Sequence, residues 1–412
     1  MPDQTVNLVI QRLGAQGDGI AEHEGRQVFV PLTLPGETVR AELSGDRARV
    51  IELLTPSLER APPKCSHYGE CGGCSLQHLS DETYATFKRS QIAQSLSYAG
   101  IEAEIAPTIV APPRSRRRAI LAAHRAEGRI AIGFHGRRSH RIVPITDCAV
   151  IRPALQALLP GLREIAAIAA PPRDALTIAA TETLTGIDLA LTGAPKNMSA
   201  DARALAVQAA TKVGLARLSI NGEVAAERIA PVLRMGNADV TPPPGGFLQA
   251  SAEAEAAMVR LVTEAVAGAK RIIDLFAGAG TFSLPLAAHA SVHAVEGELA
   301  GLASIDKASR RTQGIKPVTT EKRDLFRQPL TRLELGKYDA AVIDPPRAGA
   351  EAQTRELAAS KIGHVAMVSC NAQTFARDLK MMLDAGFKLE RLTPIDQFLW
   401  SPHVEIVAAL RR

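Results

Sequence analysis

The chain has 412 residues, enough for two or three domains, and its 46% hydrophobic and 22% charged residues exclude a disordered chain. Five cysteines are too few for a disulfide-rich secreted scaffold, the N-terminal residues lack the pattern of a signal peptide, and no apolar run reaches a spanning length. We therefore expect a cytoplasmic protein, and its formal net charge of +5 permits a polyanionic partner without requiring one.

The first segment, residues 1–58, reads as short strands separated by turns. Apolar and polar residues alternate in several short stretches, and a Gly-rich turn cluster covers residues 14–19. The expected strands are 7–13, 27–30, 37–43 and 47–54. Because no helical stretch interrupts them, they predict a small β-barrel.

The second segment, residues 59–242, predicts a mixed α+β central domain. It carries Cys65, Cys71, Cys74 and Cys148, together with arginine-rich stretches at 114–118 and 136–141. Such stretches usually mark a solvated face, but beside a metal loop they can contact phosphates. A proline- and glycine-rich linker at 242–246 ends the segment.

The third segment, residues 243–412, alternates strands with helices and begins with an amphipathic helix after Ser251. The expected strands are 271–276, 291–296, 318–322, 338–344, 364–369, 387–395 and 404–410. This order predicts a doubly wound, Rossmann-like α/β sheet of seven strands. The last two strands lack a helix between them, so they should pair antiparallel at one edge.

A glycine-rich loop follows the first of these strands and is the best candidate for a cofactor site. Residues 274–283 read Asp-Leu-Phe-Ala-Gly-Ala-Gly-Thr-Phe-Ser, and glycines allow close approach to a ligand. Glu296 ends the next strand, where it could accept both hydroxyls of a ribose. The alternative is a glycine-rich turn that binds no ligand.

Two further carboxylates, Asp324 and Asp344, also follow strands of this sheet. The carboxyl ends of parallel strands line the ligand crevice of such folds. Asp324 could accept from an adenine amino group, or it could cap a turn. Asp344 precedes two prolines, which force extended geometry and disfavour a helix cap.

Cys370 and Glu405 are the candidate catalytic pair. Cys370 ends a strand just before a helix, where the helix dipole is expected to depress the pKa of a thiol, as suits a nucleophile. Glu405 lies in an otherwise apolar strand, and a partly desolvated carboxylate suits a general base. The alternatives are a buried, inert cysteine and a carboxylate paired with an arginine or histidine.

The other four cysteines predict a metal centre. Cys65, Cys71 and Cys74 have the spacing Cys-x5-Cys-x2-Cys, and Cys148 is distant. Four thiolates suit tetrahedral zinc or an iron–sulfur cluster. Zinc sites usually show two Cys-x2-Cys pairs, and this chain has one.

Over nearly its whole length the chain resembles the S-adenosylmethionine-dependent RNA 5-methyluridine methyltransferases, and most of all the 23S rRNA uracil-C5 enzymes. The N-terminal barrel resembles a TRAM domain, an RNA-binding module of the OB class. The resemblance implies that Cys65, Cys71, Cys74 and Cys148 hold a [4Fe-4S] cluster. It implies cofactor contacts at Gln249, Phe276, Thr281, Glu296, Asp324 and Asp344, a nucleophile at Cys370 and a base at Glu405. The chain departs from the common pattern at Ser251, Ala372, Leu399 and Ser401.

The resemblance implies a mechanism in which the Cys370 thiolate attacks uracil C6, C5 takes the methyl group, and Glu405 removes the C5 proton. The target base must leave its stack to be reached. Ribosomal RNA is the expected partner, with a tRNA loop uridine as the alternative, and we expect a monomer. A different class, a non-catalytic metal-dependent RNA-binding protein, would bind RNA without the cofactor.

Overall fold

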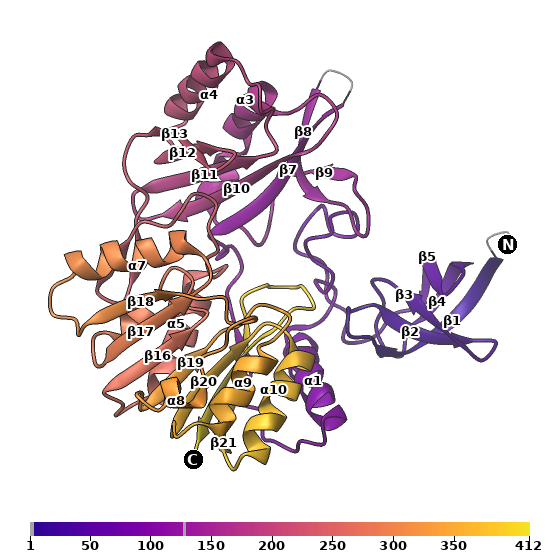
Figure 1. Cartoon of the computed structure of the whole chain (residues 1–412). Coiled ribbons are helices and arrows are strands. Elements are labelled where there is room, and N and C mark those ends of the chain that lie inside the picture. Colours follow the sequence, from indigo (N-terminus) through magenta and orange to yellow (C-terminus); the bar gives the residue numbers. More distant parts are fainter. Residues whose placement is uncertain (1–3, 127–128) are drawn as a thin grey trace.

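The computed structural model describes residues 4–126 and 129–412 and divides the chain into a barrel and two sheet-based lobes (Figure 1). The closed barrel has the strand order β1-β2-β3-β5-β4, and β1 pairs antiparallel with β4. Its strands are β1 (Gln4–Leu13), β2 (Gly19–His23), β3 (Arg26–Val30), β4 (Thr38–Ser44) and β5 (Arg47–Thr55). The sequence predicted the barrel but missed β2, which directly follows the glycine-rich turn.

The second lobe is a seven-stranded sheet with the order β13-β12-β11-β10-β7-β8-β9. Its strands are β7 (Arg118–Ala126), β8 (Arg129–His135), β9 (Ile142–Pro144), β10 (Leu176–Thr183), β11 (Gly186–Thr192), β12 (Arg217–Ile220) and β13 (Glu223–Glu227). The helices α2 (Pro153–Ala157), α3 (Leu159–Ala169) and α4 (Ala200–Lys212) accompany it. One core of buried aliphatic side chains joins α3 and α4 to the sheet. The lobe is mixed α and β, as the sequence predicted.

The third lobe is an eight-stranded sheet with the order β18-β17-β16-β19-β20-β22-β21-β6. Seven strands match the prediction: β16 (Arg271–Leu275), β17 (Ser291–Glu296), β18 (Val318–Lys322), β19 (Ala340–Ile343), β20 (His364–Ser369), β21 (Lys388–Asp396) and β22 (Glu405–Arg411). β22 pairs antiparallel with both β20 and β21. The predicted Rossmann-like fold is confirmed.

Helices cover both faces of this sheet (Figure 1). They are α5 (Ala252–Ala265), α6 (Ser283–Leu286), α7 (Leu299–Arg311), α8 (Arg332–Leu335), α9 (Glu351–Ala359) and α10 (Ala372–Asp384). The hydroxyl of Ser251 accepts from the amide of Ala254, 3.0 Å away, and caps α5. Ser251 thus supplies the helix cap that the sequence predicted. A hairpin of β14 (Leu233–Met235) and β15 (Ala238–Val240) packs against α7.

Residues 81–110 belong to the predicted central segment in sequence, but they pack on the eight-stranded sheet. The helix α1 (Asp81–Tyr98) contributes Ile92 and Leu96 to the core shared with α10. The short strand β6 (Ile109–Val110) pairs with β21 and forms the sheet's eighth strand. The chain therefore visits this lobe once before the central sheet and again after it, a path that local sequence patterns do not specify.

Candidate active site

The loop after β16 has the conformation that its glycines allow. Phe276, Gly278 and Gly280 all have positive φ, at 64°, 56° and 97°. The amide of Gly278 donates to Glu296 Oε2 at 2.9 Å, and the amide of Glu298 donates to Glu296 Oε1 at 3.0 Å. Glu296 therefore braces the loop with both carboxylate oxygens. The helix that follows, α6, has only 4 residues, so the loop rather than a long helix shapes this edge.

Asp324 caps its own turn in the structure. Its Oδ1 accepts from the amides of Phe326 and Arg327, at 3.0 and 3.3 Å. Asp324 therefore caps a turn, which is the alternative considered from the sequence. Its other oxygen, Oδ2, makes only a 3.7 Å contact with Arg327. This turn brings the exposed ring of Phe326 within 5.4 Å of the Phe276 ring, centroid to centroid. Sequence reasoning missed Phe326, whose aromatic type was its only signal.

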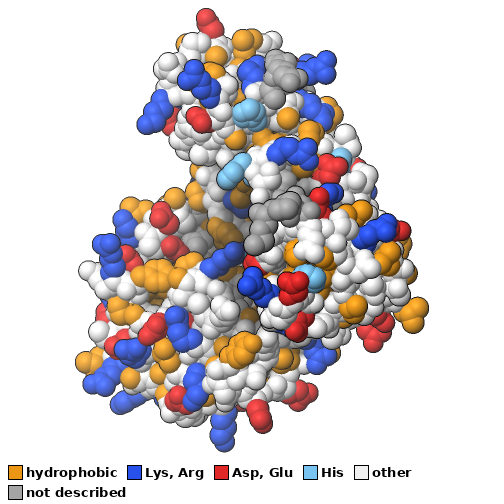
Figure 2. Space-filling model, turned by 90° about the vertical axis from the view of Figure 1, so that its right-hand side faces the viewer, with side chains coloured by type: hydrophobic (Ala, Val, Ile, Leu, Met, Phe, Trp, Pro, Cys, Tyr) orange, Lys and Arg blue, Asp and Glu red, His pale blue; other side chains and the backbone are white. Residues whose placement is uncertain are grey.

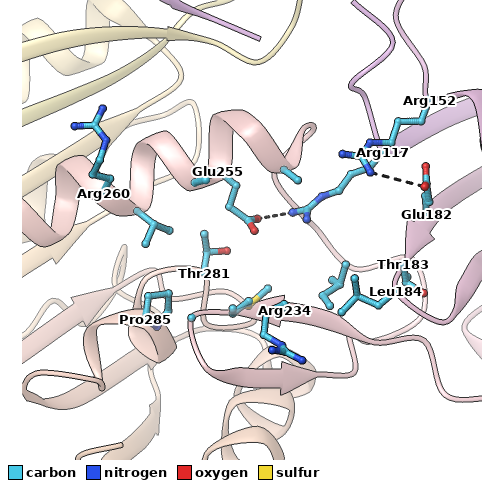
Figure 3. Close-up of a pocket in the computed structure, with 16 residues that line it drawn as sticks. Arg117, Arg152, Glu182, Thr183, Leu184, Arg234, Glu255, Arg260, Thr281 and Pro285 are labelled. Atoms are coloured by element: carbon cyan, nitrogen blue, oxygen red, sulfur yellow. Dashed lines mark hydrogen bonds and ion pairs between the residues drawn. The ribbon is translucent and has the colours of Figure 1, made fainter. Parts of the chain in front are cut away.

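Thr281 lines a cavity of about 470 Å³ between α5, the β14–β15 hairpin and the central sheet (Figure 3). An ion pair between Arg117 and Glu255 spans one side of this cavity, and both side chains are buried. Arg152 pairs with Glu182 at the same end. Thr281 therefore lies where the central lobe meets the glycine loop.

Three carboxyl groups gather around the carboxyl end of β19. Asp274 is fully buried, accepts a hydrogen bond from the Ser283 hydroxyl, and burial raises its pKa to about 7. Burial raises the pKa of Asp344 well above its ordinary value, and the nearby Glu405 and Asp274 add to the effect. A crevice that concentrates carboxyl groups in this way favours a cationic ligand. The sequence analysis had not singled out Asp274.

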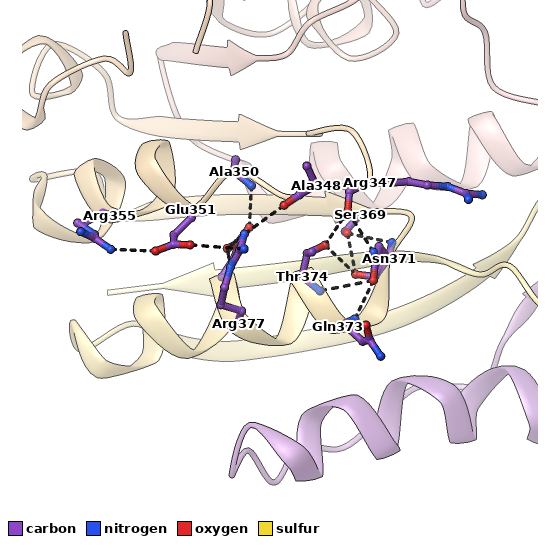
Figure 4. Close-up of polar contacts among 11 residues, drawn as sticks. Arg347, Ala348, Ala350, Glu351, Arg355, Ser369, Asn371, Gln373, Thr374 and Arg377 are labelled. Carbon is purple, nitrogen blue, oxygen red and sulfur yellow. Dashed lines mark hydrogen bonds and ion pairs between the residues drawn. The ribbon is translucent and has the colours of Figure 1, made fainter. Parts of the chain in front are cut away.

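The loop that carries Cys370 is fastened to the loop that follows Asp344 (Figure 4). Asn371 Nδ2 and the Thr374 hydroxyl both donate to the carbonyl oxygen of Arg347, at 3.1 and 3.2 Å. Asn371 Oδ1 accepts from the amides of Gln373 and Thr374 and so caps α10. These contacts hold the segment that begins at Cys370 against the loop that follows Asp344.

The predicted low pKa of Cys370 is wrong for the chain without ligands. Burial, together with the nearby Glu405 and Asp344, raises the pKa of this thiol to about 11, although Arg347 acts to lower it. The Asn371 side chain, not the thiol, takes up the first free amides of α10. The helix end therefore does little to lower the pKa of the Cys370 thiol.

Glu405 lies close to Cys370 and is buried, with an exposed fraction of 5%. Burial raises the pKa of Glu405 to about 6, against the lowering effects of a hydrogen bond from Gln397 and of the charges on Arg347 and Lys88. Gln397 Nε2 donates to Glu405 Oε1 at 2.9 Å and also to Gln249 Oε1 at 2.7 Å. The structure thus brings Gln249, Asp344, Cys370 and Glu405 to one crevice and adds Gln397.

All four remaining cysteines, Cys65, Cys71, Cys74 and Cys148, line a single cavity of about 180 Å³. The turn that bears them is tight, since a Cβ on Gly72 would lie 2.8 Å from the His135 carbonyl oxygen. Burial raises the pKa of Cys71, of Cys148 and, to about 12, of Cys74. Within residues 4–126 and 129–412, no three His, Cys, Asp or Glu side chains converge closely enough to hold a metal ion.

The cysteine-bearing segment is bonded directly to the loop that leads to Glu405. The amides of Ser75 and Leu76 donate to the Trp400 carbonyl oxygen at 2.8 and 3.0 Å. Further along, Lys88 Nζ donates to Asp396 Oδ1 at 2.9 Å, and both side chains are fully buried. Leu399 and Trp400 pack in one cluster with Cys65, Cys74 and Cys148. The cysteine cavity and the crevice are therefore neighbours.

The arginine-rich stretches divide between structural and exposed roles. Arg117 is buried against Glu255, and the guanidinium of Arg116 lies 5.5 Å from the Phe398 ring centroid. Arg137 and Arg138 both pair with the buried Asp18 of the barrel. Arg141 is exposed, and its ion pair with Glu70 is longer, at 3.5 Å. Part of the predicted basic surface therefore joins the barrel to the central lobe.

The fold and the crevice together define a class of protein, a Rossmann-like methyltransferase joined to an N-terminal β-barrel. A family model described as tRNA (Uracil-5-)-methyltransferase matches residues 237–412, and a TRAM domain model matches residues 1–50. In the described residues, no helix is long and apolar enough to cross a membrane.

Relatives place the chain more closely. It is 48% identical to an uncharacterized RNA methyltransferase of Caulobacter vibrioides, over 98% of this chain and 100% of the relative. It is 34% identical to the 23S rRNA (uracil(1939)-C(5))-methyltransferase RlmD of Halomonas elongata, over 98% of this chain and 89% of the relative. The chain belongs to the family of S-adenosylmethionine-dependent RNA (uracil-C5) methyltransferases, which confirms the resemblance.

A solved structure shares the fold across the whole chain. It is the Pyrococcus abyssi tRNA (uracil-54, C5)-methyltransferase in complex with S-adenosyl-L-homocysteine, with a TM-score of 0.77 and 23% identity. The alignment covers 98% of this chain and 100% of that one. At this identity the likeness concerns the fold alone.

Proposed function

We propose that this protein methylates C5 of a uridine in 23S rRNA through a covalent Cys370–C6 adduct, with Glu405 as the general base. The observation that carries the proposal is that Cys370 and the buried Glu405 lie at matching ends of the paired strands β20 and β22, close enough for Glu405 to raise the pKa of the thiol, while burial raises the pKa of Glu405 to about 6. Family membership supports the reaction class, and the RlmD relative of Halomonas elongata supports the rRNA target.

Uracil C5 is too weak a nucleophile to take up a methyl group unaided. The Cys370 thiol first loses its proton to solvent. The resulting thiolate adds to C6, and the π electrons of the C5–C6 double bond shift toward the C4 oxygen as an enolate, which makes C5 nucleophilic. Bound S-adenosyl-L-methionine supplies the methyl group as an electrophilic sulfonium. We assign its binding to Gln249, Phe276, Thr281, Glu296, Asp324 and Asp344. A cation beside Asp344 and Glu405 would offset the carboxylates that keep the Cys370 thiol protonated.

The closing steps belong to Glu405 and Cys370. After C5 carries both the methyl group and its hydrogen, Glu405 takes that proton, the double bond re-forms, and the bond from C6 to the Cys370 sulfur breaks. A base with a pKa of about 6 is ionised at neutral pH and still basic enough for this transfer. The proton ends on Glu405 and leaves to solvent.

We also propose that Cys65, Cys71, Cys74 and Cys148 hold a [4Fe-4S] cluster. Four thiols around one cavity fit such a group, because each thiolate binds a different iron and the sulfurs need not converge on one ion. A cluster bound there supplies a structural cross-link between the turn at 65–74 and the loop at 148. Anaerobically purified protein should contain iron and sulfide, and Cys71→Ser should lose both.

RNA binding is assigned to the barrel and the exposed arginines. The TRAM match supports the barrel's role, and the exposed Arg141 stands on the hairpin beside the cysteine turn. Figure 2 shows that Lys and Arg side chains are spread over this face among acidic ones rather than gathered in one patch. Such a surface suits contacts to a folded RNA at several separate phosphates. A cytoplasmic, monomeric enzyme goes with this proposal.

The proposal is tested with RNA that contains 5-fluorouridine. A fluorine at C5 cannot leave as a proton, so a covalent protein–RNA adduct carrying labelled methyl should persist on a denaturing gel. Cys370→Ala should form none. Methylation of ordinary RNA without any adduct on fluorinated RNA would contradict the Cys370 mechanism.

The target is tested separately by mapping 5-methyluridine in the RNA of cells with and without the gene. The proposal expects loss of one 23S rRNA site with tRNA unchanged. Loss of a tRNA site instead would leave the chemistry standing and overturn the rRNA assignment.

A further inference from the structure

Gln397 is a buried amide at the centre of the crevice. It follows β21 directly, has an exposed fraction of 2%, and bonds to residues from two separate parts of the third lobe, residues 249–250 and Glu405. Its Nε2 donates to both Gln249 Oε1 and Glu405 Oε1, and its Oε1 accepts from the amide of Ala250 at 2.6 Å. A single side chain thus links the two residues assigned to cofactor binding and proton removal.

The orientation of the Gln397 amide is determined by these partners. The backbone amide of Ala250 can only donate, so it requires the oxygen of Gln397, and the carboxylate of Glu405 in its ionised form can only accept, so it requires the nitrogen. A flipped amide would place two donors together on one side and two acceptors together on the other. The contacts therefore permit one orientation only.

This orientation also determines the orientation of Gln249. Gln249 Oε1 is occupied by Gln397, so its Nε2 is the group left to meet a ligand. Among the described residues, Gln249 Nε2 has no hydrogen-bond partner, and this nitrogen is not fully buried. Gln249 consequently offers an NH₂ donor to the crevice, and that donor fits a carbonyl or carboxylate oxygen of a substrate.

We propose that Gln397 is a positioning residue for methyl transfer, which holds the Glu405 carboxylate in place and turns the Gln249 amide so that its NH₂ group faces the substrates. This inference rests on the proposed function and deepens it. It assigns to Gln397 a role that neither the glycine loop nor the Cys370 and Glu405 motifs carry.

The other groups that face Glu405 define what a pH measurement reports. Positive charge comes from Arg347, in the loop after β19, and from Lys88, in α1. Titrating groups come from Asp344 and Cys370, which directly follow β19 and β20. Gln397 is the uncharged contact, and its hydrogen bond lowers the pKa of Glu405 against burial. Removing that bond should therefore raise the pH at which Glu405 ionises.

The test compares the pH profiles of wild type and Gln397→Met, which keeps the length of the side chain and removes its amide. The acid limb of the methylation rate should move up by about one pH unit, the order expected for a hydrogen bond to a charged group. Near pH 6 the methylated covalent adduct on ordinary RNA should accumulate, because its breakdown needs the base. Gln397→Asn is the second variant in case Gln397→Met folds poorly. It is a milder change and should move the acid limb in the same direction by a smaller amount.

Two matched variants separate positioning from simple structure. Gln353 is an equally buried glutamine of the same lobe whose amide holds the backbone of Leu330, so Gln353→Met should lower stability without moving the acid limb. Gln249→Met leaves the bond from Gln397 to Glu405, so it should raise KM for RNA or for S-adenosylmethionine with little shift of the limb. Which KM rises tells which substrate oxygen Gln249 meets.

The outcomes are distinct. An unmoved acid limb in both Gln397 variants, with an active wild type, would overturn the positioning role and leave the proposed function intact. A wild-type protein that methylates no RNA would overturn the proposed function itself, and the inference with it.

Discussion

The five cysteines occupy two neighbouring regions that differ in their nearest charged groups. Four line a cavity built from loops, beside the guanidinium of Arg116, which favours the anionic form of Cys74 and Cys148 electrostatically. Cys370 lies at the edge of a parallel sheet, beside the carboxyl groups of Asp344 and Glu405. Burial raises the thiol pKa in both regions, to about 12 for Cys74 and to about 11 for Cys370, so the regions differ in the charge beside the thiols and not in the direction of the pKa shift.

The proposed function makes the four cysteines cluster ligands and Cys370 the nucleophile, and this difference in nearby charge is in keeping with that division. A region with a nearby cation suits thiolates that bind a metal group. A region with carboxylates keeps the thiol protonated until a cation arrives, as a sulfonium would. Both regions contact the loop at 396–405, so we expect a substitution in one region to affect the properties of the other.

The largest expected effect tests the separation of roles directly. Cys370→Ala should lower methylation by at least about 10⁴-fold, since loss of a covalent nucleophile removes the whole pathway. The same variant should keep its iron and sulfide content. Loss of iron in Cys370→Ala would break the division of the cysteines into four and one.

Glu405→Gln should slow turnover by about 10²–10⁴-fold, the usual contribution of a general base. The methylated adduct should accumulate, because attack and methyl transfer precede the lost step. In the wild type, the rate should fall as the pH drops through about 6, since protonated Glu405 cannot accept the C5 proton. A flat profile between pH 5 and 7 would count against Glu405 as the base.

Lys88→Met tests the link between the regions. It leaves the buried Asp396 carboxylate without its partner, so the free energy of unfolding should fall by about 3–5 kcal/mol. Denaturant unfolding measures the loss, and Lys88→Met with Asp396→Leu should recover part of it because no unpaired charge remains. A single variant as stable as wild type would show that the link carries little energy.

Arg141→Ala should have the smallest effect, a few-fold weaker RNA binding with the salt dependence reduced by about one phosphate contact. Anisotropy titrations at several salt concentrations measure this slope. Arg203→Ala is the matched control, since Arg203 on α4 makes a comparable exposed ion pair with Glu223, at 3.3 Å. Equal losses in both variants would mean that the hairpin does not contact RNA.

The two regions were not equally predictable from sequence. The crevice follows local rules, because strand ends, a glycine loop and a lone cysteine before a helix are read from adjacent residues. The seven predicted strands are all present, but the sheet has an eighth strand, β6, that the sequence analysis missed. The low pKa predicted for Cys370 was wrong, since it considered the helix but not the carboxylates that folding brings beside the thiol.

Contacts between segments that are distant in sequence could not be predicted from local patterns. Lys88 and Asp396 are 308 positions apart, and Gln249 and Gln397 are 148 apart, so nothing local indicates either pair. A buried lysine in α1 has an ordinary helical sequence around it, and β6 is only 2 residues long. These elements are specified by the packing of the whole chain and not by a motif.

The central claim, substitution at C5 through Cys370, is tested most directly with RNA tritiated at uracil C5. Transfer of each methyl group should release one tritium to water, and Cys370→Ala should abolish release and methylation together. Methyl transfer without tritium release would show that another atom of the RNA is modified and would contradict the account.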